Sequence, residues 1–181
     1  MVSHQGTQVL NTPRLTLRPF LPNDAADMFA NWANDPEVTK FLTWPTHSTL
    51  EVSQWVCNDW VSHYTESDYY QWAIVYEGHA IGSIAVVEHD DRVGKAQIGY
   101  CIGRNWWHLG IMSEALKAVV NFLFYKVGYE RLEARHDPRN PHSGNVMKKC
   151  GMKYEGTLRQ SDWNNQGICD ASWFALLKSE R

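Results

Sequence analysis

Hydrophobic and polar residues alternate along several short stretches of the chain, and this period of two is typical of β-strands with one buried face. In residues 14–20, for example, Leu15 and Leu17 alternate with polar neighbours. The other predicted strands are residues 70–76, 80–87, 95–102, 131–136, 154–163 and 168–178. Short connections between the strands from 70 to 102 predict an antiparallel meander, and Asn164-Asn165-Gln166-Gly167 predicts a hairpin turn before the last strand.

Four other stretches repeat their hydrophobic residues every three or four positions, which is the period of an amphipathic α-helix. They are residues 24–32, 48–64, 113–125 and 140–150. At the start of the second stretch, Ser48 and Glu51 match a capping box, in which two side chains bond free backbone amides reciprocally. Its buried face is predicted to consist of Trp55, Trp60, Val61 and Tyr64.

The order of these elements is strand, two helices, three strands, helix, strand, helix and two strands, which predicts an α/β fold. We expect a mixed central sheet of about seven strands with about four helices around it. A chain of 181 residues is long enough to bury one core and short for two. The sequence therefore predicts a single domain over residues 1–181, in which residues 1–10 form a loose N-terminal segment.

The overall charge of the chain is small, with a net charge of −3 and an isoelectric point near 6.2. Such a chain offers no basic field, so we expect no nucleic-acid partner. The start of the sequence has no basic segment followed by an apolar one, and no stretch reaches the ~18 apolar residues that span a bilayer. We therefore expect a cytoplasmic protein with no membrane partner.

The cysteines and histidines do not follow the spacings of zinc motifs. Cys57, Cys101, Cys150 and Cys169 include no C-x-x-C pair. No two of the eight histidines stand at the i, i+4 spacing of helical zinc sites. We expect reduced cysteines that belong to the core, and no metal cofactor.

The loop at residues 107–113 leads from a predicted strand into the clearest predicted helix, a position where open sheets bind ligands. The first amides of a helix lack intrahelical acceptors and can therefore hold an anion. The loop contains a single glycine, Gly110, so it matches neither a Walker loop nor a dinucleotide fingerprint. From the loop alone, an ordinary helix start is a better interpretation than a phosphate site.

Four segments in the second half of the chain resemble the GNAT acetyltransferases, most closely the branch that acetylates the N-termini of ribosomal proteins (RimJ/RimL-like). The segments are residues 97–102, 104–116, 137–143 and 149–156. They occur in family order and with family spacing, and the resemblance covers roughly residues 10–178. It implies a GNAT fold and an acyltransferase that moves the acetyl group of acetyl-coenzyme A (acetyl-CoA) directly to an amine in a ternary complex.

In that family, loop amides wrap the pyrophosphate of acetyl-CoA, and the preceding strand pairs with its pantetheine arm. Carried over by position, the pyrophosphate loop is Trp107, His108, Leu109, Gly110, Ile111, Met112 and Ser113. The pantetheine strand is Tyr100, Cys101 and Ile102. Only Gly110 matches the family's loop pattern fully, because His108 stands where glycine is common and Met112 where glycine or alanine is.

The resemblance gives roles to two further residues. Asn140 would contact the arm of acetyl-CoA, and Ser143 would be the general acid that protonates the departing sulfur. The start of a helix also explains the presence of both residues without a ligand. Asn140 can be an ordinary N-cap before Pro141, and Ser143 can be a hydroxyl in the first turn. Trp106 and Trp107 likewise either line the cleft at the end of the strand or fill the edge of the core.

No motif fixes the general base. Glu88 and His136 are the leading candidates, and His89, Glu133 and Asp137 are further groups near the same strands that could take a proton. Each of them is also explained as a solvated turn or edge residue.

Two functions are consistent with the sequence. The first is an acetyl-CoA-dependent N-acetyltransferase whose acceptor is a primary amine, on a small molecule or at the N-terminus of a peptide or protein. The second is a catalytically impaired GNAT-like module that binds or senses acyl-CoA, because of the changes at His108 and Met112. The sequence leaves the acceptor open, and also the oligomeric state, with a homodimer as one option.

Overall fold

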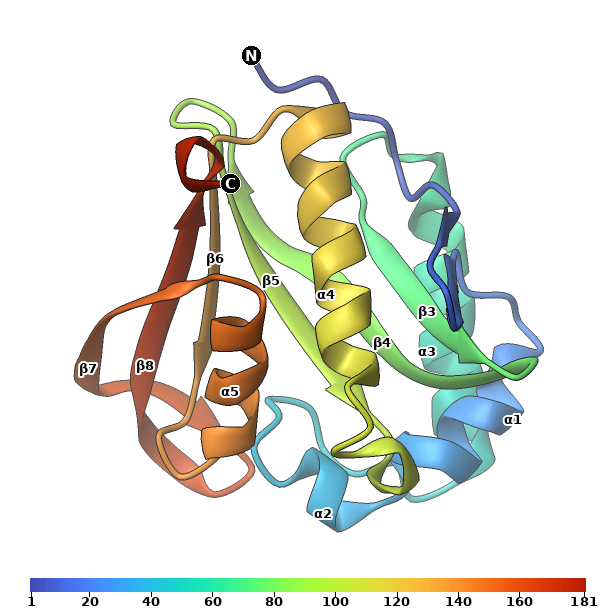
Figure 1. Ribbon diagram of the computed structural model, residues 1–181. Helices are drawn as coiled ribbons and strands as arrows, with labels where there is room; N and C mark the ends of the chain where they lie inside the picture. Colours follow the sequence, from blue (N-terminus) through green and yellow to red (C-terminus); the bar gives the residue numbers. More distant parts are fainter.

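A single mixed β-sheet forms the centre of the molecule, with helices packed against it (Figure 1). This computed structural model describes residues 1–181, and its eight strands lie in the order β1-β2-β3-β4-β5-β6-β8-β7. The strands are β1 (Leu10–Asn11), β2 (Leu15–Arg18), β3 (Gln71–Tyr76), β4 (His79–Asp90), β5 (Lys95–Ile102), β6 (Arg131–His136), β7 (Lys153–Asn164) and β8 (Gly167–Leu177). Neighbouring strands are antiparallel except for β5 and β6, which are parallel. The predicted α/β class with a mixed sheet is confirmed.

Five α-helices accompany the sheet: α1 (Asp24–Met28), α2 (Pro36–Thr39), α3 (Leu50–Ser62), α4 (Ile111–Phe122) and α5 (Pro141–Lys149). Two elements were not predicted, the strand β1 and the helix α2. They have two and four residues respectively, which is too short for a hydrophobic period to show. Local chemistry marks α2 instead, because the side chain of Asp35 accepts a hydrogen bond from the Glu37 amide and Pro36 takes the first helical position.

The start of α3 differs from the prediction. Thr49 is the N-cap and its side chain makes no capping bond, so the capping box expected at residues 48–51 is wrong. Trp55 was expected on the buried face, but 70% of it is exposed. Cys57, two residues later, is fully buried, and two residues correspond to a rotation of about 200° around a helix. Trp60 and Tyr64 do pack inward as predicted.

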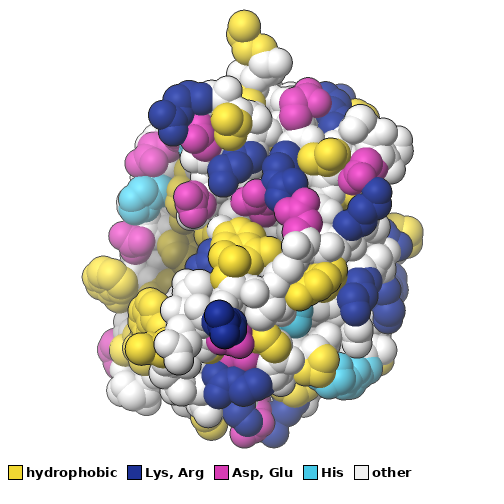
Figure 2. Space-filling view, turned by 90° about the vertical axis from the view of Figure 1, so that its left-hand side faces the viewer, with side chains coloured by type: hydrophobic (Ala, Val, Ile, Leu, Met, Phe, Trp, Pro, Cys, Tyr) yellow, Lys and Arg dark blue, Asp and Glu magenta, His cyan; other side chains and the backbone are white.

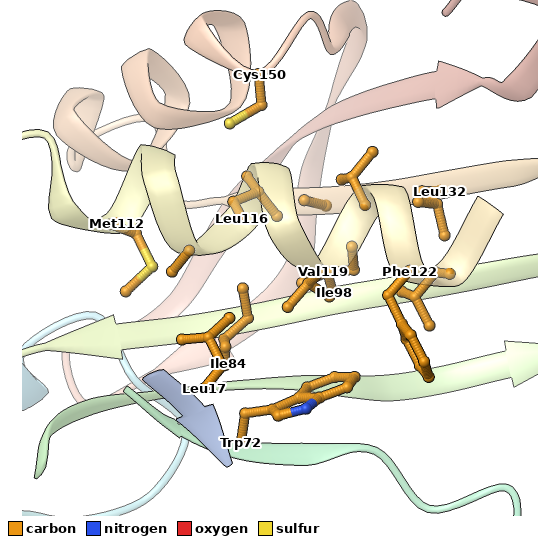
Figure 3. Close-up of a cluster of buried hydrophobic side chains, with 14 of the residues drawn as sticks. Leu17, Trp72, Ile84, Ile98, Met112, Leu116, Val119, Phe122, Leu132 and Cys150 are labelled. Carbon is orange, nitrogen blue, oxygen red and sulfur yellow. The ribbon is translucent and has the colours of Figure 1, made fainter. Parts of the chain in front are cut away.

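The alternation of side chains along β3 divides the core between the two faces of the sheet. Trp72 and Ile74 belong to the larger cluster, which lies under α4 and α5, whereas Ala73 faces the smaller cluster under α1 and α3. Figure 3 shows the larger cluster, with Leu116 and Val119 of α4 directed toward the strands. Burial of one such side chain contributes about 1.5–3 kcal/mol, so this stripe holds α4, and with it the preceding loop, against the sheet.

The N-terminal segment is bonded to the rest of the molecule, so the expectation of a loose segment at residues 1–10 is wrong. The Ser3 amide donates to the Val127 carbonyl at 2.8 Å, and Gly6 donates to Ser67 at 2.7 Å. In the other direction, the indole of the buried Trp72 donates to the Gln8 carbonyl at 2.7 Å. These partners lie more than sixty residues away, so no local pattern in the sequence indicates them.

The pairing of β5 with β6 is short and leaves an opening in the sheet. The ladder joins only residues Lys95, Ala96 and Gln97 of β5 to β6. From Ile98 onward, β5 pairs with β4 on one side and has no strand partner on the other. The end of β5 and the start of α5 lie at the bottom of Figure 1, beside α2. The fold thus places a gap next to the predicted cofactor-binding segment.

The surface carries mixed charges. Figure 2 shows the face on the β7 side, where basic and acidic side chains are interspersed with apolar ones. This face therefore offers no field of a single sign. None of the helices has the length and apolar character needed to cross a bilayer.

Candidate active site

A cavity of about 240 Å³ lies at the end of β5, between the loop that precedes α4 and the N-terminus of α5. Ser143 and all but one of the predicted cofactor-binding residues line it. They are Tyr100, Cys101, Ile102, Trp107, His108, Gly110, Ile111, Met112, Ser113, Asn140 and Ser143. Leu109 does not line the cavity and is 51% exposed. We call this cavity the cleft.

The loop before α4 has the geometry of an anion site. Gly110 is the N-cap of α4 with a left-handed φ of 76°, and no side chain caps the helix. The first intrahelical bond runs from the Glu114 amide to the Gly110 carbonyl at 3.1 Å. The amides of Ile111, Met112 and Ser113 therefore have no intrahelical acceptor and are available to a ligand.

His108 adopts the conformation that glycine would favour. Its φ is 63°, in the left-handed region, which costs roughly 1–2 kcal/mol for a residue with a Cβ. The loop thus keeps its turn although glycine is absent from this position. The His108 ring meets the ring of His142 edge to face, with centroids 4.8 Å apart, and both residues line the cleft.

Arg14 supports this loop, a role that no pattern in the sequence indicates. Its Nη1 donates to the Leu109 carbonyl at 3.0 Å, and its Nε donates to the Glu114 carboxylate at 2.7 Å. Thr12 also donates to Glu114, at 2.6 Å. Burial alone would raise the pKa of Glu114, but the bonds from Thr12 and Arg14 lower it below its usual range. The carboxylate thus stays charged and ties the start of β2 to the first turn of α4.

Ser143 is hydrogen-bonded to Tyr100 across the cleft. Ser143 Oγ donates to the Tyr100 hydroxyl at 3.2 Å, and that hydroxyl donates to the Ser143 carbonyl at 2.9 Å. Burial raises the pKa of Tyr100 well above its usual value, so the phenol remains protonated at neutral pH. The pair fixes the serine hydroxyl beside the unpaired edge of β5.

Asn140 and the two tryptophans also take positions that suit a ligand. Asn140 is the N-cap of α5, but its side chain makes no capping bond, so it is not occupied by helix capping. Trp106 and Trp107 both line the cleft and are partly buried. The Trp107 indole donates to the Ile102 carbonyl at 2.9 Å, while Trp106 packs against the larger core cluster. The two rings therefore both line the cleft and close the edge of the core.

None of the base candidates lines the cleft. Glu88 is exposed and pairs with Gln97 within β4 and β5, three residues before the cleft begins at Tyr100. The ring of His136 packs so closely on α5 that a Cβ on Gly144 would lie 2.5 Å from its Nε2. The other candidates have partners elsewhere: His89 Nδ1 lies 3.1 Å from Asp91 Oδ1, and Glu133 and Asp137 form ion pairs with Arg131 and Arg139.

The far wall of the cleft comes from α2 and the loop after it, through Val38, Phe41 and Leu42. The tip of the β7–β8 hairpin holds this wall in place. The Asn165 amide donates to the Leu42 carbonyl at 3.1 Å, and its side chain donates to the carbonyls of Thr39 and Trp44 at 2.8 Å each. The lining contains no carboxylate, and Lys149 is its one side chain that is permanently charged.

Most of the remaining tryptophans and cysteines lie in the core or on the surface, outside the cleft. Trp32 and Trp60 pack in the smaller cluster, and Trp163 is 57% exposed. Three of the four cysteines are buried as predicted, and all four are unpaired. Cys101, the exception, is partly exposed in the cleft, and burial raises the pKa of its thiol.

Comparison with known proteins identifies the family. A sequence model of the acetyltransferase (GNAT) domain matches residues 14–153. The chain belongs to the GNAT acetyltransferase family. It is therefore a GNAT N-acetyltransferase, and the resemblance seen in its sequence is confirmed.

The similar proteins include enzymes named for ribosomal substrates. The uncharacterised N-acetyltransferase p20 of Bacillus licheniformis is 30% identical over 176 residues, which are 96% of this chain and 98% of that protein. The ribosomal protein uS5-alanine N-acetyltransferase of Escherichia coli (strain K12) is 34% identical over 59 residues, 33% of this chain and 30% of that protein. RimL, a ribosomal L7/L12 α-N-protein acetyltransferase solved with coenzyme A, has a TM-score of 0.85 at 16% identity, covering 96% of this chain and 100% of that one. The likeness to RimL shows a common fold.

Proposed function

We propose that this GNAT enzyme transfers the acetyl group of acetyl-CoA to the N-terminal amine of a peptide or protein, directly and within a ternary complex. The observation that carries the proposal is the cleft itself. One cavity contains free amides at the start of α4, an unpaired strand edge at Tyr100–Ile102 and the hydroxyl of Ser143. These features suit, in turn, a pyrophosphate, an extended pantetheine arm and a leaving thiolate.

The residues present fit acetyl-CoA as the donor. In the proposed complex, the amides of Ile111, Met112 and Ser113 hold the pyrophosphate, and the Asn140 side chain contacts the arm. RimL, which shares the fold, was solved with coenzyme A. The bound donor supplies the activated acetyl group, and the open edge of β5 orients it beside the acceptor.

Ser143 is the proposed general acid. When the thioester bond breaks, the sulfur leaves as a thiolate, and the Ser143 hydroxyl gives it a proton. Tyr100, held protonated by burial, accepts a hydrogen bond from Ser143 Oγ at 3.2 Å and so positions the serine hydroxyl. After the transfer, a proton from solvent water restores the serine. Because the cleft lining contains neither Glu88 nor His136, we assign removal of the ammonium proton to solvent water at the cleft mouth.

The chemistry of the cleft walls favours a peptide over a polycation as the acceptor. Val38, Phe41 and Leu42 give an apolar wall, and the lining offers no carboxylate to a second or third ammonium group. A polyamine or aminoglycoside would therefore leave desolvated charges unpaired, which is costly. The relatives named as ribosomal-protein N-acetyltransferases agree with a protein N-terminus as the acceptor.

The Ser143→Ala variant tests the mechanism. General acid catalysis contributes about 10²–10⁴-fold to rate, so we expect kcat to fall by at least about 10²-fold while the affinity for acetyl-CoA stays within about twofold. Thiol release measures the rate, and calorimetry measures the affinity. Ser62→Ala, on the exposed face of α3, is the matched control and should match the wild type. Normal turnover by Ser143→Ala would exclude the acid assignment.

A panel of acceptors tests the substrate class. Peptides with a free N-terminal amine and acetylated lysines are compared with N-terminally blocked peptides that have free lysines, with spermidine and with an aminoglycoside. We expect turnover of the first group only. Binding of acetyl-CoA without turnover of any acceptor would instead support the alternative of an impaired binding or sensing module.

A further inference from the structure

Two histidines and an aspartate from separate segments meet at the end of the molecule opposite the cleft. His4 belongs to the N-terminal segment, His89 is in β4, and Asp91 begins the turn between β4 and β5. Asp91 bridges the two rings, with His4 Nε2 at 2.8 Å from Oδ2 and His89 Nδ1 at 3.1 Å from Oδ1. In Figure 1, the N-terminal segment and this turn lie at the top, whereas the end of β5 and the start of α4, whose residues line the cleft, lie toward the bottom.

We propose that His4, His89 and Asp91 form a binding site for a divalent zinc ion. One donor atom from each residue lies within 4.8 Å of the others. A tetrahedral zinc ion with bonds of about 2.0–2.1 Å needs donors about 3.3 Å apart, so small side-chain rotations complete the set. Two imidazoles and one carboxylate are ligands that zinc accepts, with water as the fourth.

The second nitrogen of His4 has a partner of the kind that supports a metal ligand, because His4 Nδ1 lies 3.1 Å from the Tyr70 hydroxyl. The second nitrogen of His89 faces a carboxylate, with Nε2 3.8 Å from Asp68 Oδ2, which is too far for a hydrogen bond. Histidines that bind metals usually donate their other N–H to such a group, which fixes the ring and its tautomer. Both rings are thus oriented with one nitrogen toward Asp91.

A buried hydroxyl without a partner supports the site independently. Tyr129 is fully buried between the same rings, with its centroid 6.3 Å from those of His4 and His89. Its hydroxyl has no hydrogen-bond partner in the protein. A water molecule bound to the zinc ion would give it the missing partner.

The sequence concealed this site because the ligands come from positions 4, 89 and 91, which match no helical or C-x-x-C spacing. A zinc ion here would join the N-terminal segment, β4 and the residues after α4. We therefore assign it a role in stability, separate from acetyl transfer.

Zinc binding by the whole chain tests the proposal. After treatment with EDTA, the protein is titrated with Zn²⁺ by calorimetry, and its melting temperature is measured with and without the ion. We expect one tightly bound ion per chain and a rise of at least about 5 °C at a zinc concentration about 100 times the dissociation constant. His89→Gln and Asp91→Asn should each weaken binding by at least about 100-fold. His79→Gln, which alters an exposed His–Asp pair elsewhere, should bind like the wild type.

Tyr129→Phe separates a metal site from a purely hydrogen-bonded cluster. Removal of a buried hydroxyl that has no partner should leave the metal-free protein equally stable or more stable. If the hydroxyl contacts a zinc-bound water, the same variant should bind zinc up to about 10-fold more weakly. The proposal is overturned if the wild type binds no zinc, or if binding survives unchanged in both His89→Gln and Asp91→Asn, because the ion would then lie elsewhere.

Discussion

Arg14 acts on the cleft from outside it, through the carbonyl of Leu109 and the carboxylate of Glu114. Its positive charge lies next to Gly110, since a Cβ on that glycine would be 3.6 Å from Arg14 Nη2. An arginine in this place both shapes the loop and adds to the positive potential where a pyrophosphate is proposed to bind.

We expect Arg14→Gln to raise KM for acetyl-CoA by about 10-fold, because charge-assisted hydrogen bonds contribute about 1.5–3 kcal/mol. Arg14 is 41% exposed, so the loss of stability should stay under about 1 kcal/mol. Steady-state kinetics and thermal melting separate the two effects. Lys153→Gln, which removes a surface ion pair with Glu180, is the control, and an unchanged KM for Arg14→Gln would refute the role given to this residue.

At the level of single residues, the sequence predicted the cleft better than the proton chemistry. The positions of Gly110 and Ser143 in the cleft could be predicted because backbone turns and family motifs are local in sequence. The contacts of Arg14 could not, because its partners are about a hundred residues away, and the sequence around Glu88 does not show where its side chain lies. The position of an acid on a strand indicates little about which cavity it faces.

At the scale of elements, Asp137 connects the loop after β6 to the β7–β8 hairpin. Its carboxylate accepts hydrogen bonds from Arg139 at 2.6 Å and from the side chain of Asn164 at 2.9 Å. The bond from Arg139 holds the pKa of Asp137 far below its usual range. The start of α5, and therefore Ser143, depends on this connection for its position.

The Asp137→Asn variant should lower the free energy of unfolding at pH 7 by about 1–3 kcal/mol. Because the pKa is depressed in the folded state, the contribution of the carboxylate is complete above the unfolded value of about 3.9 and is lost as the pH falls below it. The difference in the free energy of unfolding between variant and wild type, measured with urea, should therefore shrink as the pH falls from about 4 to about 2. A difference that stays constant with pH, or an equal effect of Asp59→Asn in α3, would contradict this assignment.

For the whole molecule, the proposed donor fills the gap between β5 and β6, so its binding should slow the exchange of amide hydrogens on both sides of the cleft. We expect protection at Tyr100–Ile102 and in the first turn of α4, with a melting temperature raised by about 5 °C or more at saturating acetyl-CoA. Hydrogen exchange followed by mass spectrometry resolves these segments. Protection confined to other segments would show that the donor binds elsewhere.

The fold as a whole could be predicted because its strands and longer helices have clear hydrophobic periods. The residues of α4 repeat over three turns, and β6 and α5 are bounded by turn and cap residues that are local in sequence. The elements that were missed, β1 and α2, have no room for a period. The N-terminal segment was misjudged because its anchors, such as Trp72 and Tyr70, belong to distant strands.

Because only three residues of β5 pair with β6, the sheet consists of two panels, β1–β5 and β6–β8, that share a narrow seam. Because few hydrogen bonds join the two panels, a change in their relative twist would break few of them. Helix α4 lies across both, since its buried side chains belong to the same cluster as residues of β2 and β6. Substitutions that loosen the packing under α4 should therefore weaken the connection between the two panels without any contact with a substrate.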